Sequence, residues 1–460
     1  MDKLDAERIA KQLQFPPDFF DPPAARPDDW VDDPDLRRAV DWFKSFIPRH
    51  EWIQRREQAA RRLYLSALGI NAGDGRFFDV KDCFGWYLFL AEAQLDHIHN
   101  YDYVFGSRVI PIFQAIGRDL HLLQQVDGLA PRVQLMVDKK RNQPNGGIFE
   151  LLVAASYQRA GARVAFVDEL PGQAQTHDMD IVLDGRTWAV ECKRMEVGEY
   201  SERERKEVTR LWSGCSEDIA GIQRNTLCNV SFHVELNTVP SDYLKTKVLE
   251  WLSSKKKELA WSDSTAVGHI AVLDLRPLQK VLSNNLVLGS SHRIMELLTG
   301  RYVRNANYRT LLRTIPGDNP RYVESCDLAV VLNWESLSES ALNSKARDIR
   351  KKLSEAIPQL PDGRPSIIHV GFEAVEGDRV ERLRHTKILT TARKFDPGDK
   401  LLEYVYCHYF VPESPPDESW AFDETTQWCA IRPTQPRPLD KGFLVLPSSA
   451  NDRQGAHWPK

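Results

Sequence analysis

The sequence lacks several features that would assign a function at once. It has no Cys-x-x-Cys motif and no histidine–cysteine cluster with zinc-ligand spacing. The phosphate-binding pattern Gly-x-x-x-x-Gly-Lys-Ser/Thr is absent, so the chain itself encodes no ATP-driven translocation. Helix-turn-helix and zinc-finger signatures are missing too. These absences argue against structural zinc, ATP hydrolysis and the common DNA-reading motifs.

Signals for export or membrane insertion are also missing. The N-terminus has no apolar signal-peptide core, and no apolar run approaches the roughly 18 residues of a membrane span. The seven cysteines are scattered and odd in number, as expected for reduced thiols. The sequence therefore predicts a cytoplasmic protein without a membrane partner. A net charge of -4 gives no global basic field, so nucleic acid would have to be bound by local patches.

The hydrophobic fraction of 42% in 460 residues is sufficient for a sizeable core. Composition and periodicity divide the chain into four parts. We expect an acidic, proline-rich arm over 1–35 and an all-helical N-terminal domain over 36–141. A core over 142–280 should follow, and then an α/β C-terminal region over 281–460 that packs on it.

The helical pattern of the N-terminal part begins with Leu36, Val40 and Phe43. Further helices are expected at 50–68, 85–100, 108–126 and 130–140. In the core we expect a helix at 148–160, strands at 163–167, 178–183 and 187–194, a helix at 200–225 and a strand at 229–236. After the 229–236 strand, helices are expected at 241–260 and 340–357, and strands at 269–275, 327–333, 366–372 and 402–410.

Two of these strands are joined by Asp184-Gly185, a strong signal for a two-residue hairpin turn. Pairing outward from the turn places Asp180 opposite Ala189 and Asp178 opposite Glu191. Because side chains alternate along a strand, Asp178, Asp180, Glu191 and Lys193 are expected on one face. Met179, Ile181 and Val190 should then point from the other face into the core.

Carboxylates grouped on a rigid sheet are suited to a hard cation such as Mg²⁺, which prefers oxygen ligands and retains waters and substrate phosphate. A lysine on the same face can position the attacking water or stabilise charge on the phosphate. Glu150, on the preceding helix, is expected to complete the metal shell directly or through water. His177 is expected to be a polar neighbour and not a catalyst.

The segment from about 146 to 236 resembles the PD-(D/E)XK, or restriction-endonuclease-like, nuclease superfamily. The residues that carry the resemblance are Glu150 in Gly-Gly-Ile-Phe-Glu-Leu-Leu, Asp180 in Asp-Met-Asp-Ile-Val-Leu, and Glu191 and Lys193 in Val-Glu-Cys-Lys-Arg. The expected order of helix, three strands, helix and strand also agrees. The family pattern favours Asp180 as the first acid, whereas the hairpin register favours Asp178. Both stay open as metal ligands.

The resemblance implies an α/β (α+β overall) protein with a central mixed sheet flanked by helices. It also implies a Mg²⁺-dependent nuclease, with Mn²⁺ as a substitute metal. DNA is favoured over RNA, and an endonuclease in bacterial restriction or antiviral defence is the expected role. The alternatives are a catalytically silent module that binds nucleic acid or serves in assembly, and a nuclease that is active only with a protein partner or as a homo-oligomer.

Two sets of arginines are candidates for contacts with nucleic acid. Arg194 adjoins Lys193, so it is placed to contact a phosphate. A second basic stretch interleaves arginine with tyrosine, a combination suited to phosphate pairing and base stacking. Its arginines are Arg301, Arg304, Arg309 and Arg313.

Overall fold

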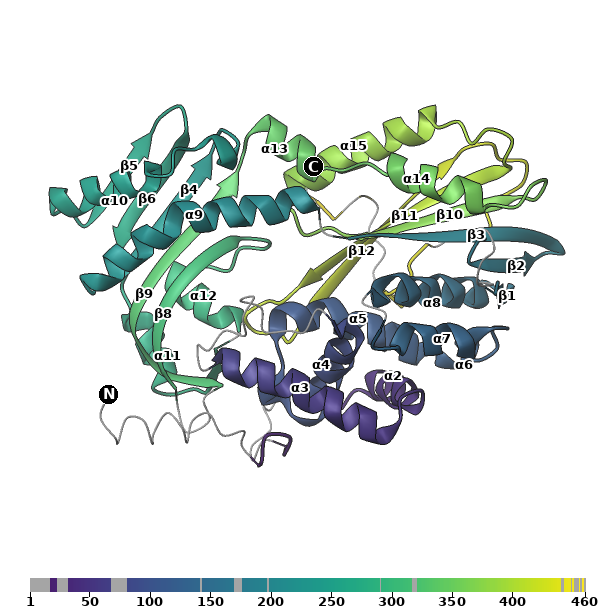
Figure 1. The fold of residues 1–460 in the computed structure, drawn as a ribbon, viewed down its shortest axis with the longest axis horizontal. Helices are drawn as coiled ribbons and strands as arrows, with labels where there is room; N and C mark the ends of the chain where they lie inside the picture. Colours follow the sequence, from purple (N-terminus) through teal and green to yellow (C-terminus); the bar gives the residue numbers. More distant parts are fainter. Residues whose placement is uncertain are drawn as a thin grey trace.

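The chain is an α/β protein with an N-terminal helical region and two mixed six-stranded sheets with interspersed helices (Figure 1). The arm expected over 1–35 lies largely outside the described residues. In the described part no helix is long and apolar enough to cross a membrane. All seven cysteines are free thiols. The computed structural model describes residues 17–22, 32–67, 81–140, 143–168, 176–196, 198–289, 291–316, 321–439, 442–447, 449–450, 455 and 457–458.

The N-terminal helical region is confirmed. The first helix of the described residues, α2, begins after Asp33, whose side chain accepts a hydrogen bond from the Leu36 N–H (2.9 Å), and Pro34 takes the first helical position. Leu36, Val40 and Phe43 are fully buried, as their spacing predicts. The helices are α2 (Pro34–Ser45), α3 (Arg49–Ala67), α4 (Cys83–Asp96), η1 (Ile98–Asn100), α5 (Tyr103–Arg118), α6 (Leu120–Leu123) and α7 (Leu129–Val137).

The first sheet contains the predicted hairpin and has the order β1-β2-β3-β10-β11-β12. Strands β1, β2 and β3 form an antiparallel meander, and β10 runs parallel to both β3 and β11. Helix α8 (Pro144–Arg159) packs against β1 and β3, and α14 (Arg350–Ala356) against β3 and β10. The strands are β1 (Arg163–Phe166), β2 (Met179–Leu183), β3 (Arg186–Met195), β10 (Ser366–Glu373), β11 (Leu402–Glu413) and β12 (Ala421–Ala430).

The second sheet has the order β5-β6-β4-β9-β7, with β8 paired to β9. It lies at the left in Figure 1, covered by α9 and α10. Its strands are β4 (Thr226–Phe232), β5 (Glu258–Ser262), β6 (Ala266–Val272), β7 (Val287–Leu288), β8 (Asn307–Pro316) and β9 (Tyr322–Ser336). The remaining helices are α9 (Glu199–Gly221), η2 (Leu236–Thr238), α10 (Tyr243–Ser254), α11 (Arg276–Leu282), α12 (His292–Thr299), α13 (Glu339–Lys345), η3 (Ile357–Gln359) and α15 (Asp378–Lys394).

The prediction that the strand after α9 belongs to the same core as the hairpin is wrong. That strand, β4, pairs with β6 and β9 in the second sheet and not with β1–β3. The neighbour of β3 is β10, which comes much later in the chain. A continuous core over 142–280 therefore does not form, because the second sheet is inserted between two adjacent strands of the first. The region over 281–460 supplies strands to both sheets.

The helical region shares one hydrophobic core with the first sheet. Side chains of α2, α4 and α5 belong to the same buried cluster as α8 and one face of β2, β3 and β11. A separate core covers the other face of this sheet, beneath α14. The helical region is thus not an independent folding layer, since its apolar face is completed by the sheet.

Three expected helices differ from the structure: the one predicted over 108–126 is divided into α5 and α6, and the other two lie later in the chain. The helix predicted over 241–260 ends at Ser254, where Lys255 takes a left-handed conformation (φ 57°) and β5 follows. The helix predicted over 340–357 is divided into α13 and α14. In the helix predicted over 241–260, the β-forming run Leu259-Ala-Trp261 pairs with β6, so sheet pairing overrides the local helical pattern.

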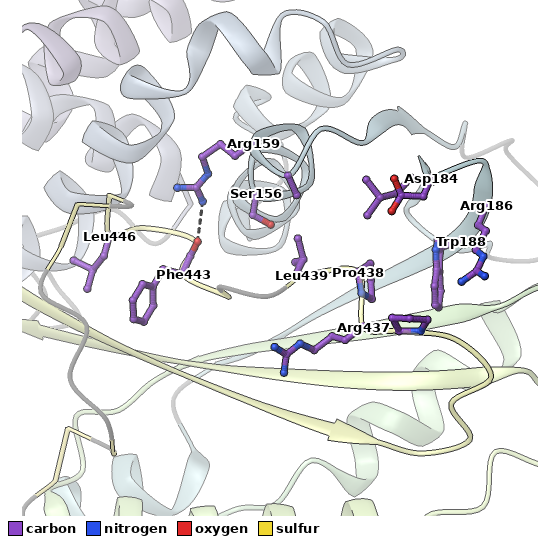
Figure 2. A pocket seen from close by; sticks show the side chains of 13 residues that line it. Ser156, Arg159, Asp184, Arg186, Trp188, Arg437, Pro438, Leu439, Phe443 and Leu446 are labelled. Carbon is purple, nitrogen blue, oxygen red and sulfur yellow. Dashed lines mark hydrogen bonds between the residues drawn. The ribbon is translucent and has the colours of Figure 1, made fainter.

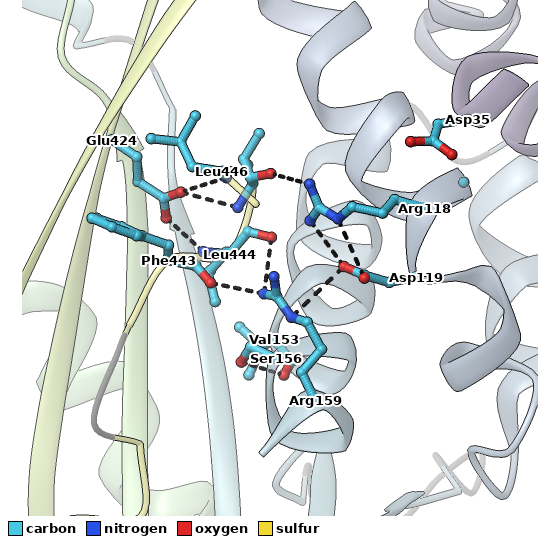
Figure 3. A network of polar contacts seen from close by, with 12 residues as sticks. Asp35, Arg118, Asp119, Val153, Ser156, Arg159, Glu424, Phe443, Leu444 and Leu446 are labelled. Atoms are coloured by element: carbon cyan, nitrogen blue, oxygen red, sulfur yellow. Dashed lines mark hydrogen bonds and ion pairs between the residues drawn. The ribbon is translucent and has the colours of Figure 1, made fainter. Parts of the chain in front are cut away.

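A buried carboxylate fixes the chain near its C-terminus (Figure 3). Glu424, on β12, accepts hydrogen bonds from the backbone N–H groups of Leu444 (2.8 Å), Val445 (3.0 Å) and Leu446 (3.2 Å). Burial raises the pKa of Glu424 to about 7, although these three bonds favour its charged form.

Two arginines tie the same segment to the helices. Arg118 donates to the Val445 carbonyl (3.0 Å) and Arg159, on α8, donates to the Phe443 carbonyl (2.8 Å). Asp119 pairs with both guanidinium groups, at 3.0 and 3.7 Å. The segment therefore joins β12 to α8 and to α5.

The stability contributed by Glu424 is expected to depend on pH. Its folded pKa of about 7 lies above the ordinary glutamate pKa of 4.5, so its contribution is complete below about 4.5 and is lost as the pH rises through 7. The glutamine side chain in Glu424→Gln does not titrate. The melting temperature of wild type should therefore fall relative to that of this variant between pH 5 and 8. Thermal melts across this range measure the difference. Exposed Glu418→Gln should show no such trend, and a parallel response of wild type and Glu424→Gln would contradict the assignment.

Candidate active site

The hairpin has the register that the sequence predicts. Leu183 pairs with Arg186, and Asp180 pairs with Ala189. The turn residues Asp184 and Gly185 both have positive φ, 52° and 74°, as a tight hairpin turn of this kind requires. The register therefore follows from the Asp-Gly turn.

The two faces of the hairpin also agree with the prediction. Met179, Ile181 and Val190 are fully buried in the core shared with the helices. Alternation therefore turns Asp180 and Glu191 toward the opposite face. No bulge shifts the register between β2 and β3.

Asp178 lies just before β2 and is held against β3 through its backbone and its side chain. Its N–H donates to the Val190 carbonyl (3.1 Å), which extends the pairing one step beyond the assigned strand. Its Oδ2 accepts a hydrogen bond from the Cys192 N–H (2.7 Å). These contacts place the Asp178 carboxylate directly beside the Glu191-Cys192-Lys193 segment.

Arg132, on α7, joins two of the candidate acids. Its Nε lies 2.6 Å from Glu150 Oε2, and its Nη2 lies 2.8 Å from Asp178 Oδ1. All three side chains are largely buried, with exposed fractions of 12–14%. Glu150 and Asp178 therefore share one guanidinium group.

Glu191 is the most deeply buried of the candidate acids, with 1% of its side chain exposed. Burial, together with the nearby charges of Asp178 and Glu150, raises its pKa to about 9, against the opposing effect of Lys193. Glu191 Oε1 forms an ion pair with Lys193 Nζ. Its Oε2 is buried and has no hydrogen-bond partner among the described residues. Among the described residues, no donor therefore compensates the burial of this carboxylate oxygen.

Asp180, the first acid that the family pattern favours, lies in a different set of contacts. His177 Nε2 is 2.6 Å from its Oδ1, and Arg364 pairs with the same oxygen. Burial raises the pKa of Asp180, but these two partners outweigh it and the net pKa is lowered. Of the two aspartates, Asp178 is the one whose charge raises the pKa of Glu191. The geometry thus favours Asp178, which the hairpin register indicates, over Asp180, which the family pattern indicates.

The charge balance of this group suits a bound cation. Asp178, Glu191 and Glu150 supply three carboxylates, against the two cations Arg132 and Lys193. Burial, and after it the charges of Asp178 and Glu150, raises the pKa of Glu191, whose Oε2 has no hydrogen-bond partner among the described residues. As they stand in the structure, no three acidic, histidine or cysteine side chains of the described residues are placed so that they could hold a metal ion. The donor set fits Mg²⁺ or Mn²⁺, provided that Arg132 gives up its bonds.

Arg194 does not lie on a surface that nucleic acid can reach. Only 9% of its side chain is exposed, and its guanidinium lies over the Phe410 ring (4.9 Å to the centroid). Alternation along β3 turns it away from Lys193, toward α8. The expected phosphate contact is therefore wrong for this residue.

The basic stretch belongs to the second sheet and the loop before it, not to the sheet with the acids. Arg301 is exposed. Arg304 pairs with Asp378 and with Glu413 (3.1 Å). The other two also have partners within the protein. Arg309 donates to the Arg205 carbonyl (3.1 Å), and Arg313 pairs with Asp327 (2.8 Å).

The turn end of the hairpin borders a pocket of about 590 Å³ (Figure 2). Trp188, Arg186 and Arg437 line it together with the C-terminal end of α8. This pocket is at the opposite end of the hairpin from Asp178, so the acid group does not open into it.

Two residues of the site were missed from the sequence. Arg132 lies in a predicted helix, and Arg364 lies in the loop before β10. Neither belongs to a motif, and only the folded chain brings them to the acids. Comparisons with family models, curated proteins and solved structures found no match.

Proposed function

We propose that the protein is a Mg²⁺-dependent nuclease that hydrolyses phosphodiester bonds, with Asp178, Glu191, Glu150 and Lys193 as its active site. The observation that carries the proposal is the grouping of three carboxylates around a buried, unpaired Glu191 oxygen, with a lysine at ion-pair distance. A scaffold without catalysis has no need of such an unfavourable charge arrangement, whereas functional sites often contain perturbed carboxylates.

The order of elements supports a restriction-endonuclease-like core. Helix α8 precedes the meander β1–β3, and the strand next to β3 is β10, preceded by α14, which packs on both strands. The order of helix, three strands, helix and strand is thus present, with the second sheet as an insertion. In this reading Glu150 comes from the first helix, and the other active-site residues come from the hairpin.

Each side chain has a distinct role in the proposed mechanism. Asp178 and Glu191, with Glu150 in support, would hold a divalent cation, and the chemistry it would supply is polarisation of the phosphoryl group and a lower pKa of a water molecule. Lys193 Nζ orients the attacking water and stabilises charge that develops on the phosphate oxygens. The Cys192 N–H keeps the Asp178 carboxylate turned toward the site.

Arg132 sets the resting state of this site. In the absence of a metal its guanidinium forms ion pairs with the largely buried carboxylates of Glu150 and Asp178. We propose that metal entry requires Arg132 to release at least one of these acids. A nuclease that waits for a substrate or partner to favour this exchange is consistent with the arrangement. We retain DNA as the favoured substrate and bacterial restriction or antiviral defence as the context, both by family analogy alone.

The matched pair Asp178→Asn and Asp180→Asn tests the proposal. Plasmid DNA incubated with the protein and Mg²⁺ should be cleaved by wild type and by Asp180→Asn. Cleavage by Asp178→Asn should fall on the order of a hundredfold or more, because a metal ligand is lost. Gel analysis of the rate gives the answer.

EDTA and Lys193→Ala serve as negative controls for the same assay. Because an inactive preparation would be uninformative, Mg²⁺ and Mn²⁺ binding is measured in parallel by calorimetry. Cleavage that persists in Lys193→Ala, or metal binding that does not depend on Glu191, would refute the nuclease assignment. Loss of function in Asp180→Asn but not in Asp178→Asn would restore the family-pattern choice.

A further inference from the structure

A cavity of about 280 Å³ lies where the N-terminal helical region meets the first sheet. Helices α4 and α5 form one side, strands β3, β10 and β11 form another, and the first turn of α8 closes it. We call it the α8 cavity. Its volume equals that of about nine liquid water molecules, enough for a small ring system with one substituent.

The apolar walls of the α8 cavity are aromatic. Trp86 and Phe105 come from the helices and meet edge to face, with their ring centroids 6.3 Å apart. Phe149 of α8 and Phe410 of β11 face them across the sheet side and also meet edge to face, at 6.2 Å. Walls of this kind hold a planar ring by stacking and edge contacts.

The polar part of the α8 cavity contains two arginines, Arg108 and Arg194, and two acids, Glu373 and Glu196. Arg108 pairs with Glu373, and Arg194 Nη2 lies 3.6 Å from the same carboxylate. Two largely buried guanidinium groups thus share one acid. Arg194 Nη1 is buried and has no hydrogen-bond partner among the described residues. Burial lowers the pKa of Arg194, as expected for a charge with incomplete compensation.

The N-terminus of α8 supplies a positive partial charge at the cavity. Gln143 and Pro144 line the cavity, and the N-cap residue Gln143 makes no side-chain capping bond. The first backbone N–H groups of this 16-residue helix therefore stay available to an anion. Glu196 also lines the cavity, but it is exposed, and its carboxylate accepts hydrogen bonds from Asn145 (3.1 Å).

We propose that the α8 cavity binds a small aromatic anion: a single ring system that carries one carboxylate or phosphate group. The anionic group is held by Arg194 Nη1 and the N-terminus of α8, and the ring packs between the aromatic walls. Tyr87 lines the cavity and stays neutral, since burial raises its pKa to about 12, so it does not repel the ligand.

A ligand bound in the α8 cavity would affect Asp178, Glu191 and Glu150 through the polypeptide chain. Arg194 follows Lys193 on β3, and Phe149 precedes Glu150 on α8. A molecule that contacts Arg194 and Phe149 therefore stiffens both elements that carry the proposed active site. The binding proposal itself does not rest on nuclease activity, because it concerns the opposite face of β3 and has its own readout.

The test is calorimetric titration of the full chain with two classes of probe. One class is the nucleoside 5′-monophosphates, and the other is the aromatic carboxylates indole-3-acetate and 4-hydroxybenzoate. The matched controls are the neutral nucleosides, indole, and inorganic phosphate or acetate alone. At least one aromatic anion should bind about tenfold or more tightly than its neutral ring and its free anion. The class that binds identifies the anionic group.

Two variants locate the binding site. Arg194→Met keeps the length of the side chain without its charge and should weaken binding about tenfold or more. Ile112→Trp fills the cavity from α5 and should abolish binding even if Arg194→Met fails to fold. Absence of binding by every aromatic anion, or unchanged affinity in a folded Arg194→Met or Ile112→Trp variant, overturns the proposal.

Discussion

Glu191→Gln is expected to abolish Mg²⁺-dependent cleavage and, at the same time, to make the metal-free protein more stable. The cleavage rate should fall on the order of a thousandfold, because a ligand of the catalytic cation is lost. The melting temperature in EDTA should rise by about 2 °C or more at pH 8. Activity and stability oppose each other here because the buried carboxylate serves the metal and not the fold.

The sign of the stability effect follows from the raised pKa of Glu191. A group whose folded pKa is about 9 instead of 4.5 stabilises the fold at low pH and loses this contribution as the pH rises through 9. The advantage of Glu191→Gln should therefore grow between pH 5 and 9. Melting curves in EDTA over this range measure it. Exposed Glu418→Gln is the control, and a constant difference across the range would contradict the buried-charge explanation.

Arg132→Gln is expected to have the opposite pair of effects: lower stability and tighter metal binding. Removal of one partner from a buried ion pair costs about 3 kcal/mol, because Glu150 and Asp178 would lose their common cation. Mg²⁺ no longer competes with the guanidinium, so its affinity should rise about tenfold. Denaturant unfolding in EDTA and calorimetric titration with Mg²⁺ measure the two quantities.

The matched control for Arg132→Gln is Arg163→Gln. Arg163 pairs with Asp127 at 2.8 Å, but the two side chains are 77% and 59% exposed, so its loss should have little effect on stability. The double variant Arg132→Gln/Glu150→Gln should recover part of the lost stability, since one unpaired acid is removed. Weaker Mg²⁺ binding in Arg132→Gln would show that Arg132 assists the metal instead of competing with it.

The hairpin could be predicted in detail because its signals are local. A two-residue Asp-Gly turn fixes the register, and alternation then fixes the face of every side chain. The same local reasoning identified most helices of the N-terminal region. It also kept Asp178 as a candidate, which the structure places beside the Glu191-Cys192-Lys193 segment.

The parts of the fold and of the candidate site that could not be predicted depend on contacts between distant parts of the chain. Arg132 reaches Glu150 and Asp178 only after α7 packs beside α8. No periodicity distinguishes β10 as the neighbour of β3, since both β4 and β10 are apolar strands of similar length. The sequence did not indicate that Arg194 is buried, because the family pattern concerns Glu191 and Lys193, which lie on the other face of β3.

The insertion of the second sheet has a consequence for synthesis of the protein on the ribosome. Strand β3 is made early, but its parallel partner β10 follows only after the entire second sheet, so one edge of β3 stays unpaired meanwhile. Closure of such a long loop is slow compared with local pairing. The nascent chain therefore completes the sheet around Glu191 and Lys193 late, so the proposed active site reaches its final form only after β10 has been translated.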